Sequence, residues 1–299
     1  MQFKRAWKQV DGVLLLDKPI GLTSNDALQK ARRLFSAAKG GHTGTLDPLA
    51  TGLLPLCFGE ATKFSADLLD ADKTYEAELK LGVTTDSGDA EGQIIATVAV
   101  DVEKDAIFKV LPQFVGDIAQ VPPMHSALKR NGRPLYELAR KGIEVEREAR
   151  AVTIHAIELL AFSGDRVTLR VSCSKGTYIR VLAADIGAAL GCGAHLVGLR
   201  RTRVGDLDLA RSVTLAELES MDEAGRAGRL QPVDALLHSL PLLNLDGAAA
   251  ERFRHGNPVD LAAGLAGKIR VYVDDRLIGV GEPGSDGRLW PKRLVQLAT

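Results

Sequence analysis

The segment with the greatest chemical content is a glycine- and threonine-rich stretch, residues 41–52, which contains a single acidic residue, Asp47. Glycines let a backbone turn tightly or approach a ligand closely, and Pro48 disfavours the helical conformation for the residue before it. We therefore expect Asp47 on an extended turn. An ionised carboxylate among uncharged neighbours is unfavourable when buried unless a cation pairs with it. A plain turn aspartate, or the N-cap of a helix starting near Pro48, would give the same pattern.

A cation that could pair with this carboxylate occurs at the end of a predicted strand. Residues 166–174 alternate apolar and polar side chains, and residues 179–190 have the pattern of a helix. Tyr178 and Arg180 therefore lie where this helix begins. An opposite charge within about 4–6 Å lowers the pKa of a carboxylate, so Arg180 could keep Asp47 ionised. An exposed surface arginine is the alternative interpretation.

Two further residues in these segments have side chains suited to binding a base. Tyr75 lies on the apolar face of an alternating segment, residues 74–81, which predicts a half-buried strand. An ordinary core aromatic is the simpler interpretation of this tyrosine. His42 is a lone histidine, for which a structural role is the simpler interpretation.

The sequence lacks the residues that several classes of chemistry require. The three cysteines, Cys57, Cys173 and Cys192, form no CxxC pair, which argues against a disulfide framework and a structural zinc site. The sequence has no P-loop, no zinc-deaminase signature and no nucleophilic Cys–His context. Chemistry in these segments would therefore have to use a carboxylate and no metal.

The elements around these residues indicate an α+β protein with a mixed or antiparallel sheet. Its 299 residues suggest a large domain and a smaller one. Strands and helices alternate without a regular βαβ repeat or a GxGxxG fingerprint. We predict a strand at 12–16 and a capping box at 23–26 that begins a helix. Short strands and turns after residue 245 suggest an appended β-barrel.

Charge distribution argues only weakly for a nucleic-acid partner. The 38 basic and 38 acidic residues cancel, whereas such proteins are often basic. However, residues 1–46 carry eight basic and three acidic residues, and residues 124–150 carry seven and four. A polarised surface of this kind could bind phosphates. No apolar run is long enough for a membrane span, and residues 12–16 are too short for a signal peptide, so we expect a cytoplasmic protein.

With these segments in view, the sequence resembles the TruB family of tRNA pseudouridine synthases. Four motifs match in order, and a fifth segment also matches. They are Gly12–Ser24, the loop Gly41–Gly52, Lys73–Glu76, Ser174–Arg180 and, as the fifth, Val121–Lys129. Resemblance covers most of residues 11–205 and, more weakly, the C-terminal region.

The resemblance implies a pseudouridine synthase catalytic domain over residues 1–240, with a basic RNA-clamping insertion at about 124–150. A small PUA-like RNA-binding barrel would follow over residues 245–299. The implied activity is isomerisation of uridine 55 in the T loop of tRNA to pseudouridine, after the base flips out and without a cofactor. Asp47 would be the nucleophile, attacking either the sugar or the base.

The same resemblance assigns the remaining site residues. Tyr75 would stack on the uracil, Arg180 would pair with Asp47, and His42 would fill the space that the flipped base leaves. The other expected substrate contacts are Tyr178, Leu199, Lys18, Lys129 and Arg130. Expected partners are the T arm of tRNA and, through the C-terminal domain, its acceptor end, with no membrane and no obligatory protein partner for a monomeric enzyme.

Three other interpretations compete with this one. The protein could be an RNA-folding module with an idle pocket, a role that could also be a second activity of the enzyme as a tRNA-folding chaperone. It could be a guide-RNA-dependent relative that works within a multi-protein particle. A non-enzymatic structural protein would leave the ordered motifs unexplained.

Overall fold

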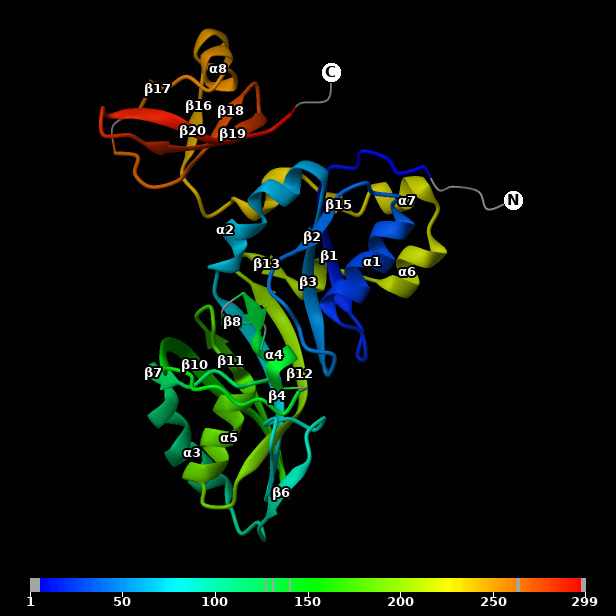
Figure 1. Ribbon diagram of the computed structural model, residues 1–299, viewed down its shortest axis with the longest axis vertical. Helices are drawn as coiled ribbons and strands as arrows, with labels where there is room; N and C mark the ends of the chain where they lie inside the picture. Colours follow the sequence, from blue (N-terminus) through cyan, green and yellow to red (C-terminus); the bar gives the residue numbers. More distant parts are fainter. Residues whose placement is uncertain (1–5, 127, 131, 140, 262–263, 297–299) are drawn as a thin grey trace.

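The computed structural model describes residues 6–126, 128–130, 132–139, 141–261 and 264–296. A large mixed sheet runs along the molecule, with helices packed against it, and a small five-stranded sheet lies at one end of the long axis (Figure 1). The large sheet has the order β14-β1-β3-β12-β4-β11-β10-β7. Most of its pairs are antiparallel, but β1–β14 and β12–β3 are parallel. The α+β class and the mixed sheet are thus as the sequence predicts.

The N-terminal part of the sheet carries the Asp47 loop. Strand β1 (Gly12–Lys18) pairs with β3 (Ala50–Phe58), which also pairs with the short β2 (Gly40–His42). Helix α1 (Ser24–Leu34) begins at Thr23 with the predicted capping box and buries its apolar side against β3. The glycine-rich composition of residues 39–48 predicts a loop, but the structure corrects this prediction because Gly40–His42 form β2 and pair with the end of β3.

The second half of the sheet is formed by long antiparallel strands. Strand β4 (Lys73–Leu81) lies between β12 (Ala194–Val204) and β11 (Arg166–Cys173), and β10 (Arg150–Ser163) and β7 (Gly116–Gln120) complete this side. The alternating residues of β4 and β11 bury one face against helix α5 (Ile179–Ala189), as their pattern predicts. The smaller elements of this half are β5 (Val83–Thr85), β6 (Ile94–Thr97), α3 (Lys104–Val110) and the 3₁₀ helix η2 (Leu111–Phe114).

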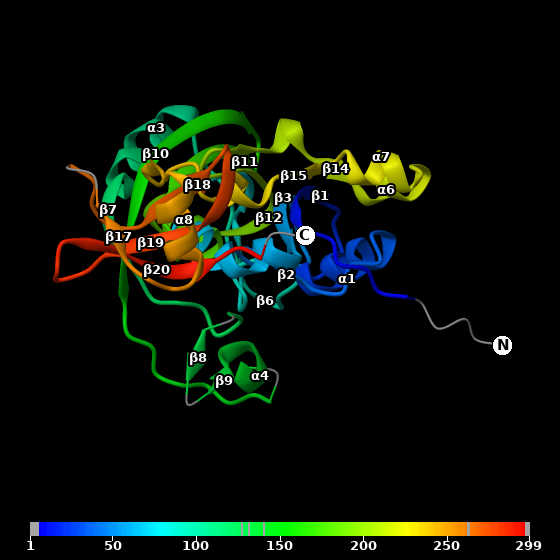
Figure 2. The same cartoon turned by 90° about the horizontal axis from the view of Figure 1, so that it is seen from above.

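The predicted insertion lies between β7 and β10. It contains β8 (Lys129–Arg130), β9 (Arg133–Pro134) and α4 (Leu135–Ala139). Seen from above, this segment projects away from the body of the molecule on two extended connections (Figure 2).

Shorter elements complete the larger unit. Three of them are strands that pair within the large sheet, β13 (Leu207–Asp208), β14 (Val213–Thr214) and β15 (Leu230–Gln231). The others are η1 (Gly59–Phe64), α2 (Ser65–Leu69), η3 (Leu209–Arg211), α6 (Leu215–Ser220), α7 (Glu223–Ala227) and η4 (Val233–Leu236).

The C-terminal sheet has the order β16-β18-β19-β20-β17 and curls as a half-barrel, which fits a PUA-like domain. Its strands are β16 (Leu242–Asn244), β17 (Val259–Asp260), β18 (Ile269–Val273), β19 (Arg276–Pro283) and β20 (Arg288–Leu294). Helix α8 (Gly247–Arg254), which the sequence analysis did not predict, covers one side of its core. Apolar side chains of β18 and β19 pack together with η4 of the larger unit. The division at residues 240–245 stays a prediction.

Candidate active site

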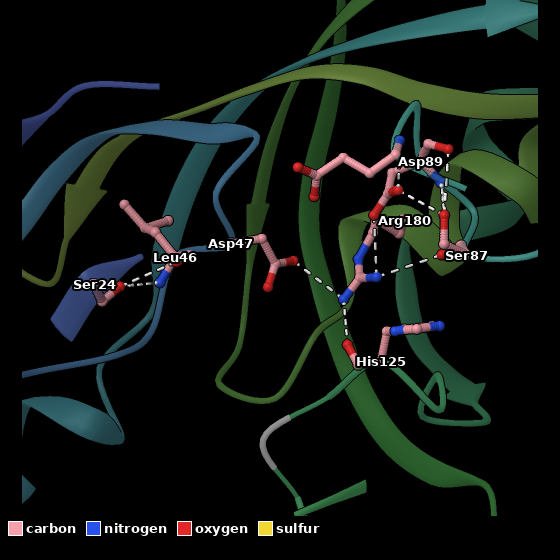
Figure 3. Close-up of polar contacts among 8 residues, drawn as sticks. Ser24, Leu46, Asp47, Ser87, Asp89, His125 and Arg180 are labelled. Carbon is pink, nitrogen blue, oxygen red and sulfur yellow. Dashed lines mark hydrogen bonds and ion pairs between the residues drawn. The ribbon is translucent and has the colours of Figure 1, made fainter. Parts of the chain in front are cut away.

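Asp47 lies on a loop that several backbone contacts hold in place between β2 and β3. The hydroxyl of Ser24, at the start of α1, accepts a hydrogen bond from the Leu46 amide at 2.8 Å and donates to the Leu46 carbonyl at 3.1 Å (Figure 3). The Asp47 carbonyl accepts from the amide of Ala50 at 3.0 Å. The side chain of Asp47 remains 44% exposed, so the carboxylate is both fixed by its loop and accessible.

Arg180 reaches this carboxylate from the first turn of α5. Its Nη2 atom lies 3.1 Å from an Asp47 carboxylate oxygen, and its side chain is only 8% exposed. The same nitrogen donates to the carbonyl of His125 at 2.7 Å, and Nη1 donates to the carbonyl of Ser87 at 3.4 Å. The ion pair expected from the sequence is therefore present (Figure 3).

A second carboxylate, which sequence reasoning missed, holds the other side of this guanidinium. Asp89 is 3% exposed and accepts from Nη1 of Arg180 at 3.1 Å. Its second oxygen accepts from the hydroxyl of Ser87 at 2.6 Å and from the amide of Glu91 at 3.1 Å. All these partners fix the orientation of Asp89, and Arg180 consequently lies between two anions (Figure 3). No local pattern distinguishes Asp89 from the exposed acidic residues beside it.

The protein environment shifts the ionisation of Asp47 in a direction the sequence did not predict. Desolvation by the surrounding protein raises the pKa of Asp47 above its usual value, while the guanidinium of Arg180 opposes this rise. Nearby Asp89 adds to the increase and Lys18 opposes it. Arg180 thus favours the ionised form, as expected, but does not fully offset the cost of burial.

Tyr75 and Leu199 meet on adjacent strands beside this pair. Tyr75 on β4 packs against both main cores of the large sheet, and burial raises the pKa of its phenol. Leu199 on β12 lies opposite Ala77 of β4 and pairs with Ala50 of β3, immediately after the Asp47 loop. The structure therefore gathers these predicted residues at the point where β3, β12 and β4 lie side by side.

Arg201 is the second residue that sequence reasoning missed. It lies directly opposite Tyr75 in the β12–β4 pair and is 1% exposed. Its neighbours Arg200 and Arg203 are partly exposed and pair with Asp17 and Asp208. Among several arginines in one strand, only the three-dimensional register identifies the buried one.

His42 and Lys18 lie close to the loop but make different contacts. His42 sits on β2, where burial and the charge of Arg201 lower the pKa of its ring, and its Nδ1 atom has no protein partner. Lys18 is fully buried, and its ammonium donates to the carbonyls of Pro19 and Leu22 at 3.0 and 2.7 Å. Burial lowers the pKa of Lys18 to about 8. These contacts assign Lys18 to the turn before α1, and its predicted contact with substrate stays a prediction.

Tyr178 is positioned by a side chain that the sequence analysis did not identify. The amide group of buried Gln120 accepts from the backbone N–H of Tyr178 at 2.9 Å and donates to its carbonyl at 3.3 Å. Gln120 ends β7, just before the insertion, so it links that strand to the start of α5. The predicted contacts Lys129 and Arg130 form β8, but their side chains lie outside the described residues.

The described residues were compared with the requirements of a metal site and of a membrane-spanning helix. Within the described residues, no group of three or more His, Cys, Asp and Glu side chains could hold a metal ion. In the same part of the chain, no helix combines the length and apolar character needed to cross a bilayer. The three cysteines are buried and free.

Comparison with protein families covers most of the sequence. Residues 32–179 match the N-terminal domain of TruB family pseudouridylate synthases, residues 180–238 match a tRNA pseudouridylate synthase B C-terminal domain, and residues 241–295 match a pseudouridine synthase II TruB C-terminal domain. A tRNA pseudouridine synthase B from Dechloromonas aromatica (strain RCB) is 80% identical over 298 residues, which is 100% of both chains. The chain belongs to the TruB family. It is accordingly an RNA pseudouridine synthase, an isomerase.

Other relatives of this TruB family member support the same assignment. The tRNA pseudouridine synthase B of Azoarcus sp. (strain BH72) is 59% identical over 299 residues, covering 100% of this chain and 99% of the relative. Among solved structures, the archaeal box H/ACA sRNP Nop10–Cbf5 complex matches with a TM-score of 0.71 and 27% identity, covering 95% of this chain and 85% of that one. An H/ACA RNP bound to a substrate RNA containing 2′-deoxyuridine matches with a TM-score of 0.72 and 27% identity, covering 96% and 85%.

Proposed function

We propose that this synthase converts uridine 55 in the T loop of tRNA to pseudouridine, with Asp47 as the nucleophile. The observation that carries the proposal is the ion pair between Asp47 and Arg180 at 3.1 Å, whose carboxylate is near enough to Tyr75 to act on the phenol electrostatically. The high identity to curated tRNA pseudouridine synthases B supports tRNA as the substrate.

The reaction balances without a cofactor. The N1–C1′ glycosidic bond breaks, the uracil rotates, a C5–C1′ bond forms, C5 loses a proton and N1 gains one. The Asp47 carboxylate attacks either C1′ or the base, and both routes need its ionised form. Arg180 holds the carboxylate in place and favours this form, while Asp89 and the carbonyl of His125 hold the guanidinium. Because Arg180 makes these contacts before substrate arrives, the site is preorganised.

The residues around the pair would receive the flipped nucleotide. Tyr75 stacks on the uracil with its hydroxyl near the C5 proton, and Leu199 and Tyr178 line the pocket. His42 has a lowered pKa and an unpartnered Nδ1 atom, so a neutral ring is available to fill the space that the base leaves in the T loop. Lys129 and Arg130 would contact phosphates from the insertion, and the C-terminal sheet would contact the acceptor end.

Replacing Asp47 by asparagine tests the nucleophile. We expect tRNA affinity to remain close to that of the wild type and turnover to be abolished, because an amide is not nucleophilic here. Tritium release from tRNA carrying [5-³H]uridine measures turnover, and filter binding measures affinity. Asp206→Asn, in the exposed turn between β12 and β13, is the matched control. Pseudouridine formation by Asp47→Asn, detected by mass spectrometry after derivatisation, would contradict the assignment.

Mapping pseudouridine in bulk tRNA with and without the protein tests the target position. A modification confined to the T loop supports the proposal, and a modification elsewhere contradicts it. Turnover of a bare T-arm stem-loop by the purified chain would support an enzyme that needs no obligatory protein partner. Light scattering of the same sample gives its oligomeric state.

A tRNA-folding role would accompany this activity. Extraction of a T-loop base requires the elbow of the tRNA to loosen, at a cost of a few kcal/mol for unstacking. The insertion at about 124–150 projects from the body of the molecule (Figure 2). The carbonyl of His125 in this insertion accepts a hydrogen bond from Arg180, so the insertion could hold the loosened loop. If so, Asp47→Asn should still accelerate refolding of misfolded tRNA while forming no pseudouridine. A refolding rate that does not change with added Asp47→Asn would exclude this second role.

A further inference from the structure

Arg201 is a buried cation whose contacts differ from those of an ordinary core residue. Its side chain is among the largest that are fully buried. In the part of the chain that the structure describes, it forms no ion pair with a carboxylate, although burial of a charge is costly when no anion compensates it. Two backbone carbonyls accept hydrogen bonds from it in place of an anion, and Tyr75 is its neighbour on the adjacent strand.

Two of these contacts bracket the loop that carries Asp47. Nε of Arg201 donates to the carbonyl of Leu53 at 2.8 Å, and Nη2 donates to the carbonyl of Gly44 at 3.0 Å. Gly44 precedes Asp47 by three residues and Leu53 follows it by six. One planar guanidinium therefore ties the two arms of the loop together, and charge-assisted hydrogen bonds of this kind are stronger than neutral ones.

The third neighbour is Tyr75. Arg201 and Tyr75 are register partners in the antiparallel β12–β4 pair, and directly opposed residues have Cβ atoms about 4.5–5.5 Å apart on one face of the sheet. Burial raises the pKa of the Tyr75 phenol, and the charge of Arg201 opposes this rise. The arginine that holds the Asp47 loop thus also lies beside the aromatic residue on the neighbouring strand.

Close backbone packing at two glycines keeps the loop on this guanidinium. A Cβ atom at Gly52 would lie 2.3 Å from the carbonyl oxygen of Arg201, and one at Gly44 would lie 3.3 Å from its Nη1 atom. Both glycines have positive φ angles, 97° and 71°, which other residues rarely adopt. The loop can therefore approach Arg201 closely only because both positions lack a side chain.

We propose that Arg201 is a positioning residue that fixes the Asp47 loop against Tyr75, so that the nucleophile and the phenol meet the same nucleotide. The proposal rests on the proposed function of this site. An arginine with a purely structural role would stabilise the fold, and its removal would slow the reaction equally with or without the Tyr75 hydroxyl. For a positioning arginine, the decrease in rate on removing Arg201 depends on whether the Tyr75 hydroxyl is present.

A double-mutant cycle tests this dependence. Single-turnover pseudouridine formation and tRNA affinity are measured for Arg201→Met, Tyr75→Phe and the double variant. Because misplacement of reacting groups by about 1 Å can reduce a rate about 100-fold, we expect Arg201→Met to lower the single-turnover rate by about that factor. Affinity should change by less than about threefold, and the loss in the Tyr75→Phe background should be at least about tenfold smaller.

Two further variants keep the test decisive. Arg203→Met removes a half-exposed arginine from the same strand and should leave the rate unchanged. Arg201→Lys retains the charge but not the planar arrangement of donors, so its decrease in single-turnover rate should also depend on the Tyr75 hydroxyl. If Arg201→Met does not fold, Arg201→Lys replaces it in the double-mutant cycle. Equal losses in both backgrounds, or a wild-type rate in Arg201→Met, would overturn the proposal. Pseudouridine formation by the wild type in the same assay tests the proposed function separately.

Discussion

Replacing Asp89 by asparagine is expected to slow catalysis without removing any group that touches the substrate. Aspartate and asparagine have the same shape, but the partners of the Asp89 side chain all donate hydrogen bonds to it, so both of its terminal atoms must act as acceptors. One oxygen accepts from Nη1 of Arg180, and the other accepts from the Ser87 hydroxyl and the Glu91 amide. An asparagine must therefore direct its NH₂ group either at the Arg180 guanidinium or at the Glu91 N–H.

The magnitude follows from this geometry. In either orientation the site loses one hydrogen bond of a charged group, and such bonds contribute about 1.5–3 kcal/mol. If the loss is felt fully in the transition state, the single-turnover rate falls by about 10- to 150-fold, at 1.36 kcal/mol per factor of ten. The loss comes from a less rigidly held Arg180, so tRNA affinity should change little.

Single-turnover tritium release with the folded variant measures the effect, and thermal unfolding gives its stability. Asp86→Asn is the control, because Asp86 lies on the same loop but is exposed and accepts only the amide of Gln93. A rate within about threefold of the wild type would refute the idea that the second carboxylate holds Arg180 for catalysis.

Two predictions concern stability. Gly52→Ala should lower the free energy of unfolding by at least about 2 kcal/mol, because its Cβ would lie 2.3 Å from the Arg201 carbonyl oxygen at a φ of 97°. Urea unfolding measures this change. The control is Gly41→Ala, which should be nearly neutral because a Cβ there would meet nothing within 4 Å. Asp47→Asn should be more stable than the wild type at pH 7. Because the pKa of Asp47 is raised in the folded state, that state binds the proton more tightly, and wild-type stability falls as pH rises from about 4 through the raised pKa. The advantage of Asp47→Asn should therefore shrink towards pH 4 in thermal unfolding, and a less stable variant at pH 7 would mean that the Arg180 ion pair outweighs burial.

Local patterns in the sequence were sufficient for the elements that position the site. Alternation over residues 74–81 and 166–174 predicts β4 and β11, because one face of each strand is buried. The Thr23 capping box predicts the start of α1 for a similarly local reason. Pro48 and the glycines mark the Asp47 loop as irregular, and only the short β2 pairing within it was missed.

Apart from Arg180, whose pairing with Asp47 the sequence suggested, tertiary structure alone decided which charges surround the nucleophile. Asp89 and Arg201 lie in runs of similar residues, and their burial depends on strand register and on loops that are distant in sequence. The same is true of Lys18, whose ammonium turns to two carbonyls and away from solvent. Charge type and spacing are properties of the chain, whereas desolvation and pairing are properties of the assembled sheet, because they depend on which segments exclude water from a group. The sequence therefore determined which residues could react, and the fold determined how their ionisation and orientation are controlled.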